Sequence, residues 1–286
     1  MSVDRAELKG GAESFMFTVL GSKGFIGSHL VRELAELDLE CYAPDRDEKL
    51  PKKDLGTIVY CVGLTADFRS RPFDTVAAHV CTLNDVLKDC EFDSLLYISS
   101  ARVYGGQKRE ARENDPLKID PSQGDHLYNI SKAMGESLTL NCGRPARVVR
   151  LSNVYGDDYT SPNFLPTIIR AAIVKKKIVL QTSLDSAKDY IGISDVVRLL
   201  IKIATSGRQR TYNLASGVNV SHRALTTKLR EVTGCEVETI ENAPTITFPT
   251  ISIDRIKEEF GFQPSSILDD LSKLIESHAD HVGRRG

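Results

Sequence analysis

At 286 residues the chain is long enough to bury a substantial core, either as one large α/β domain or as a domain with a smaller lobe. Its composition, 41% hydrophobic and 27% charged, is ordinary for a globular protein, and a net charge of −2 excludes a strong overall field for nucleic acid or a membrane surface. The six cysteines lack the spacing of metal ligands, and residues 1–14 carry charges where a signal peptide needs an apolar core. We therefore expect a cytoplasmic protein with no metal, no nucleic-acid partner and no membrane contact.

Short apolar runs alternate with longer amphipathic stretches in the first half of the chain. The apolar runs predict strands at Phe15–Leu20, Glu40–Ala43, Thr57–Val62, Ser94–Ser99 and Ala146–Leu151. The amphipathic stretches between them predict helices at Ile26–Leu37, Phe73–Cys90 and His126–Cys142. This alternation indicates an α/β protein with a Rossmann-type, doubly wound parallel sheet. The stretch Asp47–Asp54 is short enough for a loop to replace a strand.

Beyond Tyr155 this alternation becomes less regular. Helices are expected at Pro162–Val174, Asp195–Thr205, Ser221–Thr233 and Asp254–Phe260, and a strand at Thr211–Leu214. We expect residues 15–155 to form a cofactor-binding domain that also receives residues 189–215. Residues 156–286 are expected to form mainly a smaller substrate-binding lobe with a predicted N-cap at Ser221.

The first strand runs directly into a glycine-rich turn, GSKGFIG at residues 21–27, which opens a helix. One glycine permits a tight turn, one lets a pyrophosphate approach the backbone, and one lets the helix lie close to the strand. The helix N-terminus offers free N–H groups to the phosphates. Turn glycines can also be purely structural, but their position between strand and helix favours dinucleotide binding.

The choice between NAD and NADP depends on charged residues near this turn. Asp45 ends the second strand, where a carboxylate accepts hydrogen bonds from a ribose diol and repels a 2′-phosphate. Lys23 and Arg46 point the other way, because either cation can pair with a 2′-phosphate, although both also suit a solvated surface. The position of Asp45 favours NAD, with NADP as the alternative.

Two segments carry a candidate catalytic set. Tyr128 and Lys132 form a YxxxK pattern on one helix face, where a nearby ammonium stabilises a tyrosinate. Such a pattern is common on exposed helices. Ser100, however, lies at the end of a predicted parallel strand, where open α/β sheets keep their ligands. We expect Ser100 to hold a substrate oxygen while Tyr128 exchanges its proton and Lys132 binds the nicotinamide ribose.

These motifs occur together with two later segments, RVVRLSNVYG at 147–156 and KDYIGISDV at 188–196. The ordered set resembles the extended short-chain dehydrogenase/reductases, specifically the NAD-dependent epimerase/dehydratase family that modifies nucleotide sugars, and its motifs are most similar to those of UDP-galactose 4-epimerases. The resemblance implies that Ser100, Tyr128 and Lys132 are catalytic and that Asn153 and Lys188 contact the substrate. It also implies that the cofactor is lined by Gly21, Gly24, Phe25, Ile26, Gly27, Asp45 and Leu64. We add Arg46 to this set.

Four positions depart from the family pattern. Ala101 and Arg102 stand where sugar 4,6-dehydratases carry an Asp-Glu pair, so that chemistry lacks its acid and base. Lys188 replaces a usual Arg, which weakens bidentate recognition of a pyrophosphate. His79 replaces a usual Asn, and a histidine satisfied by packing is at least as good an interpretation as a role in the site.

The sequence therefore predicts a nucleotide-sugar epimerase or 4-ketoreductase that transfers a hydride at a sugar carbinol with tyrosinate acid/base catalysis. The alternatives are a dehydratase or decarboxylase of the same family, and a catalytically silent cofactor-binding regulator. The resemblance also implies a homodimer through the helices at 73–90 and 126–142. The residues themselves supply only part of an outward apolar stripe, which leaves a monomer with a singly amphipathic helix pair as the alternative.

Overall fold

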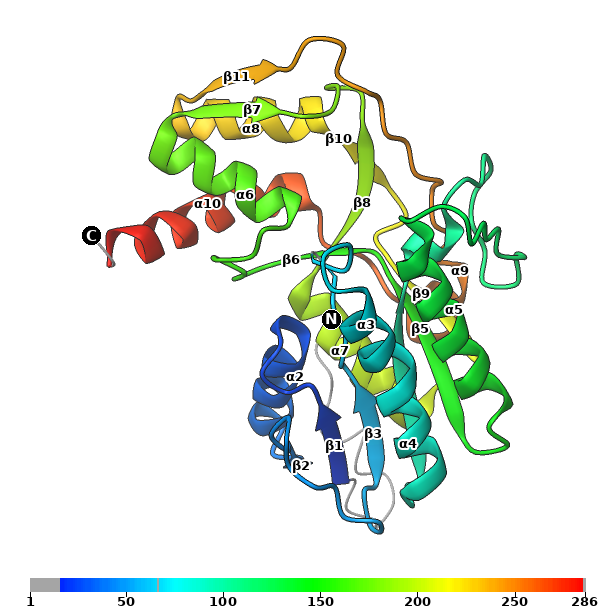
Figure 1. Ribbon diagram of the computed structural model, residues 1–286. Helices are drawn as coiled ribbons and strands as arrows, with labels where there is room; N and C mark the ends of the chain where they lie inside the picture. The colour runs from blue at the N-terminus through cyan, green and yellow to red at the C-terminus, as the bar shows by residue number, and fades with distance from the viewer. Residues whose placement is uncertain (1–15, 66, 285–286) are drawn as a thin grey trace.

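The structure, a computed structural model, describes residues 16–65 and 67–284 (Figure 1). Its centre is a six-stranded parallel sheet. The strands are β1 (Met16–Leu20), β2 (Glu40–Tyr42), β3 (Thr57–Tyr60), β4 (Ser94–Ser100), β5 (Ala146–Leu151) and β9 (Thr211–Leu214). All six predicted strands are confirmed within two residues at each end; Phe15 lies outside the described residues. Residues 47–54 form no strand, as expected.

In the strand order β2-β1-β3-β4-β5-β9, the direction in which successive strands are added to the sheet reverses between β1 and β3. The chain leaves β1 toward one edge of the sheet, and then returns past it to build the other side. A crevice opens at the carboxyl ends of the strands at such a reversal, and ligands of open α/β sheets bind there. The glycine-rich turn follows β1, so the topology positions it at this crevice.

Helices cover both faces of the sheet, which confirms the doubly wound prediction. One face carries α2 (Phe25–Glu36) and α7 (Ile193–Ser206), which contact each other. The other face carries α3 (Pro72–Val76), a π-helical turn η1 (Ala77–Cys81), α4 (Thr82–Asp89) and α5 (His126–Asn141). The predicted helix Phe73–Cys90 is thus interrupted by a π-helical turn. A short 3₁₀ turn, η2 (Ala101–Tyr104), directly follows β4.

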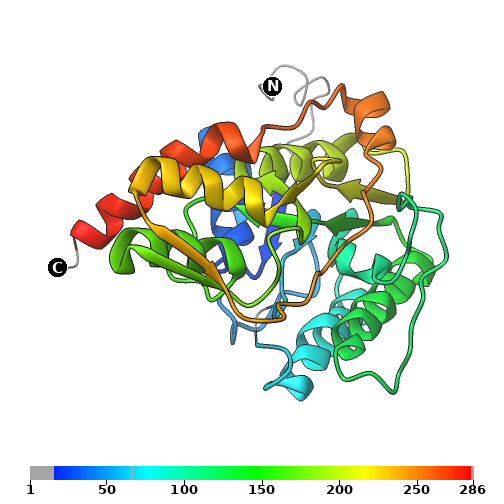
Figure 2. The same cartoon turned by 90° about the horizontal axis from the view of Figure 1, so that it is seen from above.

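A smaller lobe lies beside the carboxyl ends of the sheet (Figures 1 and 2). Its strands are β6 (Asn153–Tyr155), β7 (Lys177–Leu180), β8 (Ala187–Gly192), β10 (Asn219–Ser221) and β11 (Glu236–Thr239). Its helical elements are α6 (Phe164–Arg170), the π-helical turn η3 (Ala171–Lys175), α8 (His222–Thr233) and α10 (Ile267–Gly283). The helices α8 and α10 lie side by side over a separate apolar cluster that includes Leu225 and Leu271. Ser221 caps α8 as predicted, because its hydroxyl accepts the Ala224 N–H at 3.1 Å.

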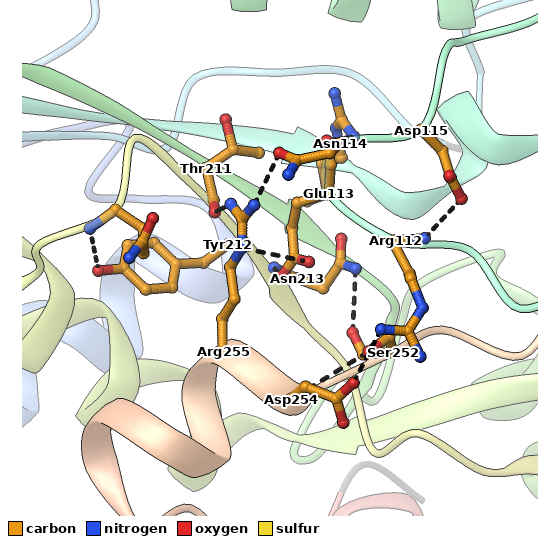
Figure 3. Close-up of polar contacts among 12 residues, drawn as sticks. Arg112, Glu113, Asn114, Asp115, Thr211, Tyr212, Asn213, Ser252, Asp254 and Arg255 are labelled. Atoms are coloured by element: carbon orange, nitrogen blue, oxygen red, sulfur yellow. Dashed lines mark hydrogen bonds and ion pairs between the residues drawn. The ribbon is translucent and has the colours of Figure 1, made fainter.

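A polar cluster covers the outer edge of the large sheet at β9 (Figure 3). The backbone N–H of Asn213 donates to the Glu113 carboxylate at 3.0 Å, and its side-chain amide donates to the Ser252 carbonyl at 3.0 Å. Arg255, in α9 (Asp254–Phe260), donates to the Thr211 carbonyl at 2.7 Å. These bonds satisfy backbone groups of an edge strand that would otherwise be open to pairing. They therefore give this cluster a structural role.

The segment 189–215 crosses back from the small lobe to the large sheet, where it supplies α7 and β9. We keep the division into residues 15–155 with 189–215, and residues 156–286, as a proposal for the functional lobes. Among the residues that the structure describes, no helix combines the length and apolarity needed to cross a membrane.

Candidate active site

The glycine-rich turn forms a backbone cradle between β1 and α2. Gly21 has a φ of +83°, and a Cβ there would lie 2.9 Å from the carbonyl carbon of Cys61. A Cβ on Gly27 would overlap the carbonyl oxygen of Gly21. Gly24 is the N-cap of α2 and makes no side-chain cap, so the first helical N–H groups, beginning with Phe25 and Ile26, are available to an anion. The cradle therefore fits the pyrophosphate of a dinucleotide.

Lys23 and Asp45, which favour different cofactors, are in direct contact. Lys23 Nζ lies 2.7 Å from Asp45 Oδ1, and both side chains are exposed. Arg46 is also exposed and has no hydrogen bond or ion pair among the described contacts. The Asp45 carboxylate, three residues beyond the end of β2, thus has one cation already bound to it.

Ser100 and Tyr128 meet at the carboxyl end of β4. Tyr128, in the first turn of α5, is only 3% exposed, and its side chain lies next to that of Ser100. Burial raises the pKa of Tyr128, while the Ser100 hydroxyl and the nearby Arg102 guanidinium oppose the rise. In the protein alone, Tyr128 is therefore a phenol at neutral pH.

Lys132 lies one helical turn beyond Tyr128 and is 4% exposed. Its ammonium donates to the Ile98 carbonyl at 2.9 Å. Burial lowers the pKa of Lys132 to about 7, and the Glu136 carboxylate acts against this decrease. Glu136 is itself held by Arg150, with Nη2 2.7 Å from Oε2. The structure therefore places an ionisable lysine one helical turn from Tyr128, held by the Ile98 carbonyl and close to the buried Glu136–Arg150 ion pair.

Arg102 is a second cation at the site. Its guanidinium carbon lies 4.9 Å from the centroid of the Tyr128 ring and 4.9 Å from that of the Phe68 ring. The two rings are 5.3 Å apart and almost fully buried, so the half-buried guanidinium covers them. Its own backbone N–H donates to Ser100 Oγ at 3.3 Å. The sequence identified Arg102 only as a departure from the patterns of dehydratases and decarboxylases.

His79 is fully buried at the site, where it connects two functional segments. The Leu64 N–H donates to His79 Nε2 at 3.3 Å, so Nδ1 carries the proton and donates to Ser131 Oγ at 2.8 Å. The Ser131 hydroxyl donates in turn to the Tyr128 carbonyl at 2.9 Å. Burial and the Lys132 ammonium lower the pKa of His79 to about 3, which keeps the ring neutral. His79 thus connects the predicted cofactor loop to the helix that carries Tyr128.

The two residues expected to contact the substrate lie on neighbouring strands of the small lobe. Asn153, on β6, is exposed and donates its side-chain amide to the Asp189 carbonyl at 2.8 Å. Lys188, on β8, places its ammonium 5.0 Å from the centroid of the Phe164 ring. Burial and the charge of Arg102 both lower the pKa of Lys188, so these two cations, one from each lobe, lie near each other.

Two residues of this arrangement were missed by sequence reasoning. Phe68 lies in a loop without any periodic pattern, and no local signal marked it. Ser131 lies inside the YNISK segment, but its partner His79 is 52 residues away in the sequence. Only the packing of η1 against α5 makes their relation visible.

This chain belongs to the NAD dependent epimerase/dehydratase family, whose sequence profile matches residues 17–215. The family resemblance inferred from the motifs is thereby confirmed. The family comprises NAD-dependent epimerases, reductases and dehydratases of sugar nucleotides.

Individual relatives are more distant. A dTDP-4-dehydro-6-deoxy-D-allose reductase from a Streptomyces species is 24% identical, over 92% of this chain and 96% of its own length. A GDP-6-deoxy-D-talose 4-dehydrogenase from Aggregatibacter actinomycetemcomitans is 25% identical, over 78% and 82% respectively.

Solved structures show the same fold. MoeE5 in complex with UDP-glucose and NAD superposes with a TM-score of 0.81 at 22% identity, covering 93% of this chain and 99% of that one. UDP-glucose 4-epimerase from Thermotoga maritima, with UDP-glucose, gives a TM-score of 0.76 at 17% identity and the same coverage.

Proposed function

We propose that the protein is an NAD-dependent nucleotide-sugar epimerase or 4-ketoreductase that works at a sugar carbinol through Ser100, Tyr128 and Lys132. The observation that carries the proposal is the buried Tyr128 phenol, which lies next to Ser100 at the end of β4 and is followed by Lys132 on the same helix face. Relatives named as a reductase and a 4-dehydrogenase support the same reaction class.

The chain's own groups would divide the work as follows. The glycine cradle and the N-terminus of α2 hold the pyrophosphate, Asp45 holds the adenine ribose, and Lys132 holds the nicotinamide ribose. When bound there, the nicotinamide supplies or accepts a hydride. Ser100 orients the substrate oxygen, and Tyr128 gives a proton to that oxygen or takes one from it.

The reductive direction has one additional argument in its favour. Tyr128 is a phenol in the protein alone, because burial raises its pKa. A phenol is the form that donates a proton to the oxygen of a ketone as it becomes an alcohol. The opposite direction requires a tyrosinate, which Arg102 and Lys132 would stabilise. Dehydration is not supported, since Ala101 and Arg102 occupy the places of its acid and base.

The test begins with a thermal-shift screen of UDP-, GDP-, CDP- and dTDP-sugars with NAD and NADP, because a specific ligand stabilises the folded state. Turnover is then followed by the absorbance of the reduced nicotinamide. Tyr128→Phe should lower turnover by at least about 10²-fold while cofactor affinity is nearly unchanged. Normal turnover in this variant would reject the catalytic assignment. Retention of cofactor through purification indicates an epimerase, since a reductase must exchange it in each cycle.

A further inference from the structure

We propose that Arg102 forms a carboxylate-binding subsite beside Tyr128, so that the reacting sugar is a nucleotide-linked uronic acid. The inference rests on the proposed function, because it takes Tyr128 as the group at the reacting carbinol. It adds the chemical class of the substrate.

The first argument is the state of the guanidinium. Arg102 is half-buried against Phe68 and Tyr128, and burial lowers its pKa. Within residues 16–65 and 67–284 its guanidinium makes no ion pair and no hydrogen bond. A cation that has lost water without gaining an anion is costly, and an anionic ligand removes that cost.

The surrounding charges do not supply such an anion. The carboxylate that acts on Arg102 is that of Asp125, and it is already bound in a bidentate pair by Arg69. The other charges near Arg102 are cations, Arg69 and Lys188. Elsewhere in the same fold, the buried Arg150 is paired with Glu136 at 2.7 Å. An unpaired guanidinium is therefore a feature of this site and not of buried arginines in the chain generally.

The second argument is position. Arg102 lies directly over the Tyr128 ring, and its backbone N–H is bonded to Ser100, the other group at the reacting oxygen. In a pyranose that reacts at C4, the diphosphate on C1 is across the ring, whereas C5 and its substituent C6 are adjacent. A cation stacked on Tyr128 thus lies beside the substituents of the two carbons next to C4, and of these only C6, on C5, becomes an anion in a common sugar. In a uronic acid that substituent is a carboxylate, whose two oxygens match the planar fork of a guanidinium.

The experiment compares matched ligands that differ only at C6. Binding of UDP-glucose and UDP-glucuronic acid, and of GDP-mannose and GDP-mannuronic acid, is measured by calorimetry on the NAD⁺-loaded protein. In at least one pair the uronic acid should bind about 10-fold to 100-fold more tightly, the scale of a hydrogen-bonded charge pair. Arg102→Met should remove this preference while the affinities for NAD⁺ and for the nucleoside diphosphate alone stay within about twofold. Arg102→Lys should retain part of the preference.

Arg69→Lys is the matched control, because Arg69 also lies over the Phe68 ring, at 4.6 Å, and a lysine there keeps a cation beside Asp125, so that this carboxylate is not released toward Arg102. It should leave the preference intact. Equal binding of the two sugars in both pairs overturns the proposal, and so does the absence of any binding. A preference for the uronic acid that survives Arg102→Met overturns it as well. A parallel loss of affinity for UDP or GDP alone would assign Arg102 to the diphosphate and also overturn it. These are binding measurements, so they fail independently of the turnover test on Tyr128.

Discussion

At the scale of single residues, the buried Lys132 makes a prediction about stability. The folded chain releases the Lys132 proton above about pH 7, because burial lowers the pKa from its ordinary value of 10.5. Between about pH 7 and pH 10.5 the unfolded chain holds more protons than the folded one. The free energy of unfolding therefore rises with pH through this window. Lys132→Met should therefore raise Tm by about 2 °C or more near pH 6. The gain should shrink toward zero by about pH 10.

The matched control is Lys273→Met, since Lys273 is exposed on α10. It should show no pH-dependent change in Tm. A gain in Lys132→Met that is the same at every pH would be due to better packing and would contradict the assignment to charge.

Asp45 makes a prediction about cofactor choice. Its carboxylate holds Lys23 at 2.7 Å, so removing it releases a cation as well as deleting the ribose acceptors. Asp45→Ala should weaken NAD and strengthen NADP, each by roughly 5-fold to 10-fold, the scale of one charged hydrogen bond. Titration of both cofactors checks this, with the exposed neighbour Asp47→Ala as control. A wild-type protein that already prefers NADP would show that Lys23 and Arg46 outweigh Asp45.

At the scale of elements, the π-helical turn η1 shows how packing alters a predicted helix. The Tyr60 hydroxyl donates to the Ala78 carbonyl at 2.6 Å, and the Tyr97 hydroxyl donates to the His79 carbonyl at 3.2 Å. Gly135 lets α5 approach this turn, since a Cβ there would overlap the Tyr97 hydroxyl. A single π-turn inside a helix often marks a functional site. Here it places the imidazole of His79 between Leu64 and Ser131.

We therefore expect His79 to act as a positioning residue for the cofactor loop. His79→Leu leaves the Leu64 N–H without an acceptor and should weaken NADH binding by about fivefold or more. His79→Gln offers an amide oxygen near the former Nε2 and should restore most of the affinity. Fluorescence titration with NADH measures both. If Leu and Gln variants lose affinity equally, His79 contributes packing alone, and the connection to Leu64 has no role in binding.

The other elements follow the sequence where local signals are strong. Strand β5 and helix α9 have the predicted bounds, because a continuous apolar run and the stop signal at Gly261 define them locally. No helix was predicted for Ile267–Gly283, which form α10. Its buried residues Ile267, Leu271 and Ile275 recur at four-residue spacing, so the periodic signal was present.

At the scale of the whole molecule, the helix pair α4 and α5 bears on assembly. These helices lie on one sheet face, as expected, and Met134 and Cys81 are exposed there. Val86 is 2% exposed and packs into the core, so it adds nothing to an outward apolar face. Phe73, at the start of α3, is 88% exposed and adds apolar surface that the sequence had not counted.

We keep the family-based expectation of a homodimer through this face. Light scattering at micromolar concentration with NAD should give a dimeric mass, and Met134→Glu should give a monomer. Val179→Glu is a matched control, since Val179 is 49% exposed on the small lobe and Met134 is 51% exposed. A monomeric wild-type protein, or equal dissociation by both substitutions, would reject this interface.

The sequence by itself determined the family, the parallel α/β fold, the cofactor cradle and the expected catalytic set, because each depends on local patterns. Glycines between a strand and a helix, and residues four apart on one helix, carry their geometry with them. The tertiary structure alone decided which side chains surround Tyr128. Phe68, His79 and Arg102 come from three separate segments, and their approach depends on how η1, α5 and the end of β4 pack together. The ionisation of Lys132 was likewise decided by burial, which no local pattern encodes.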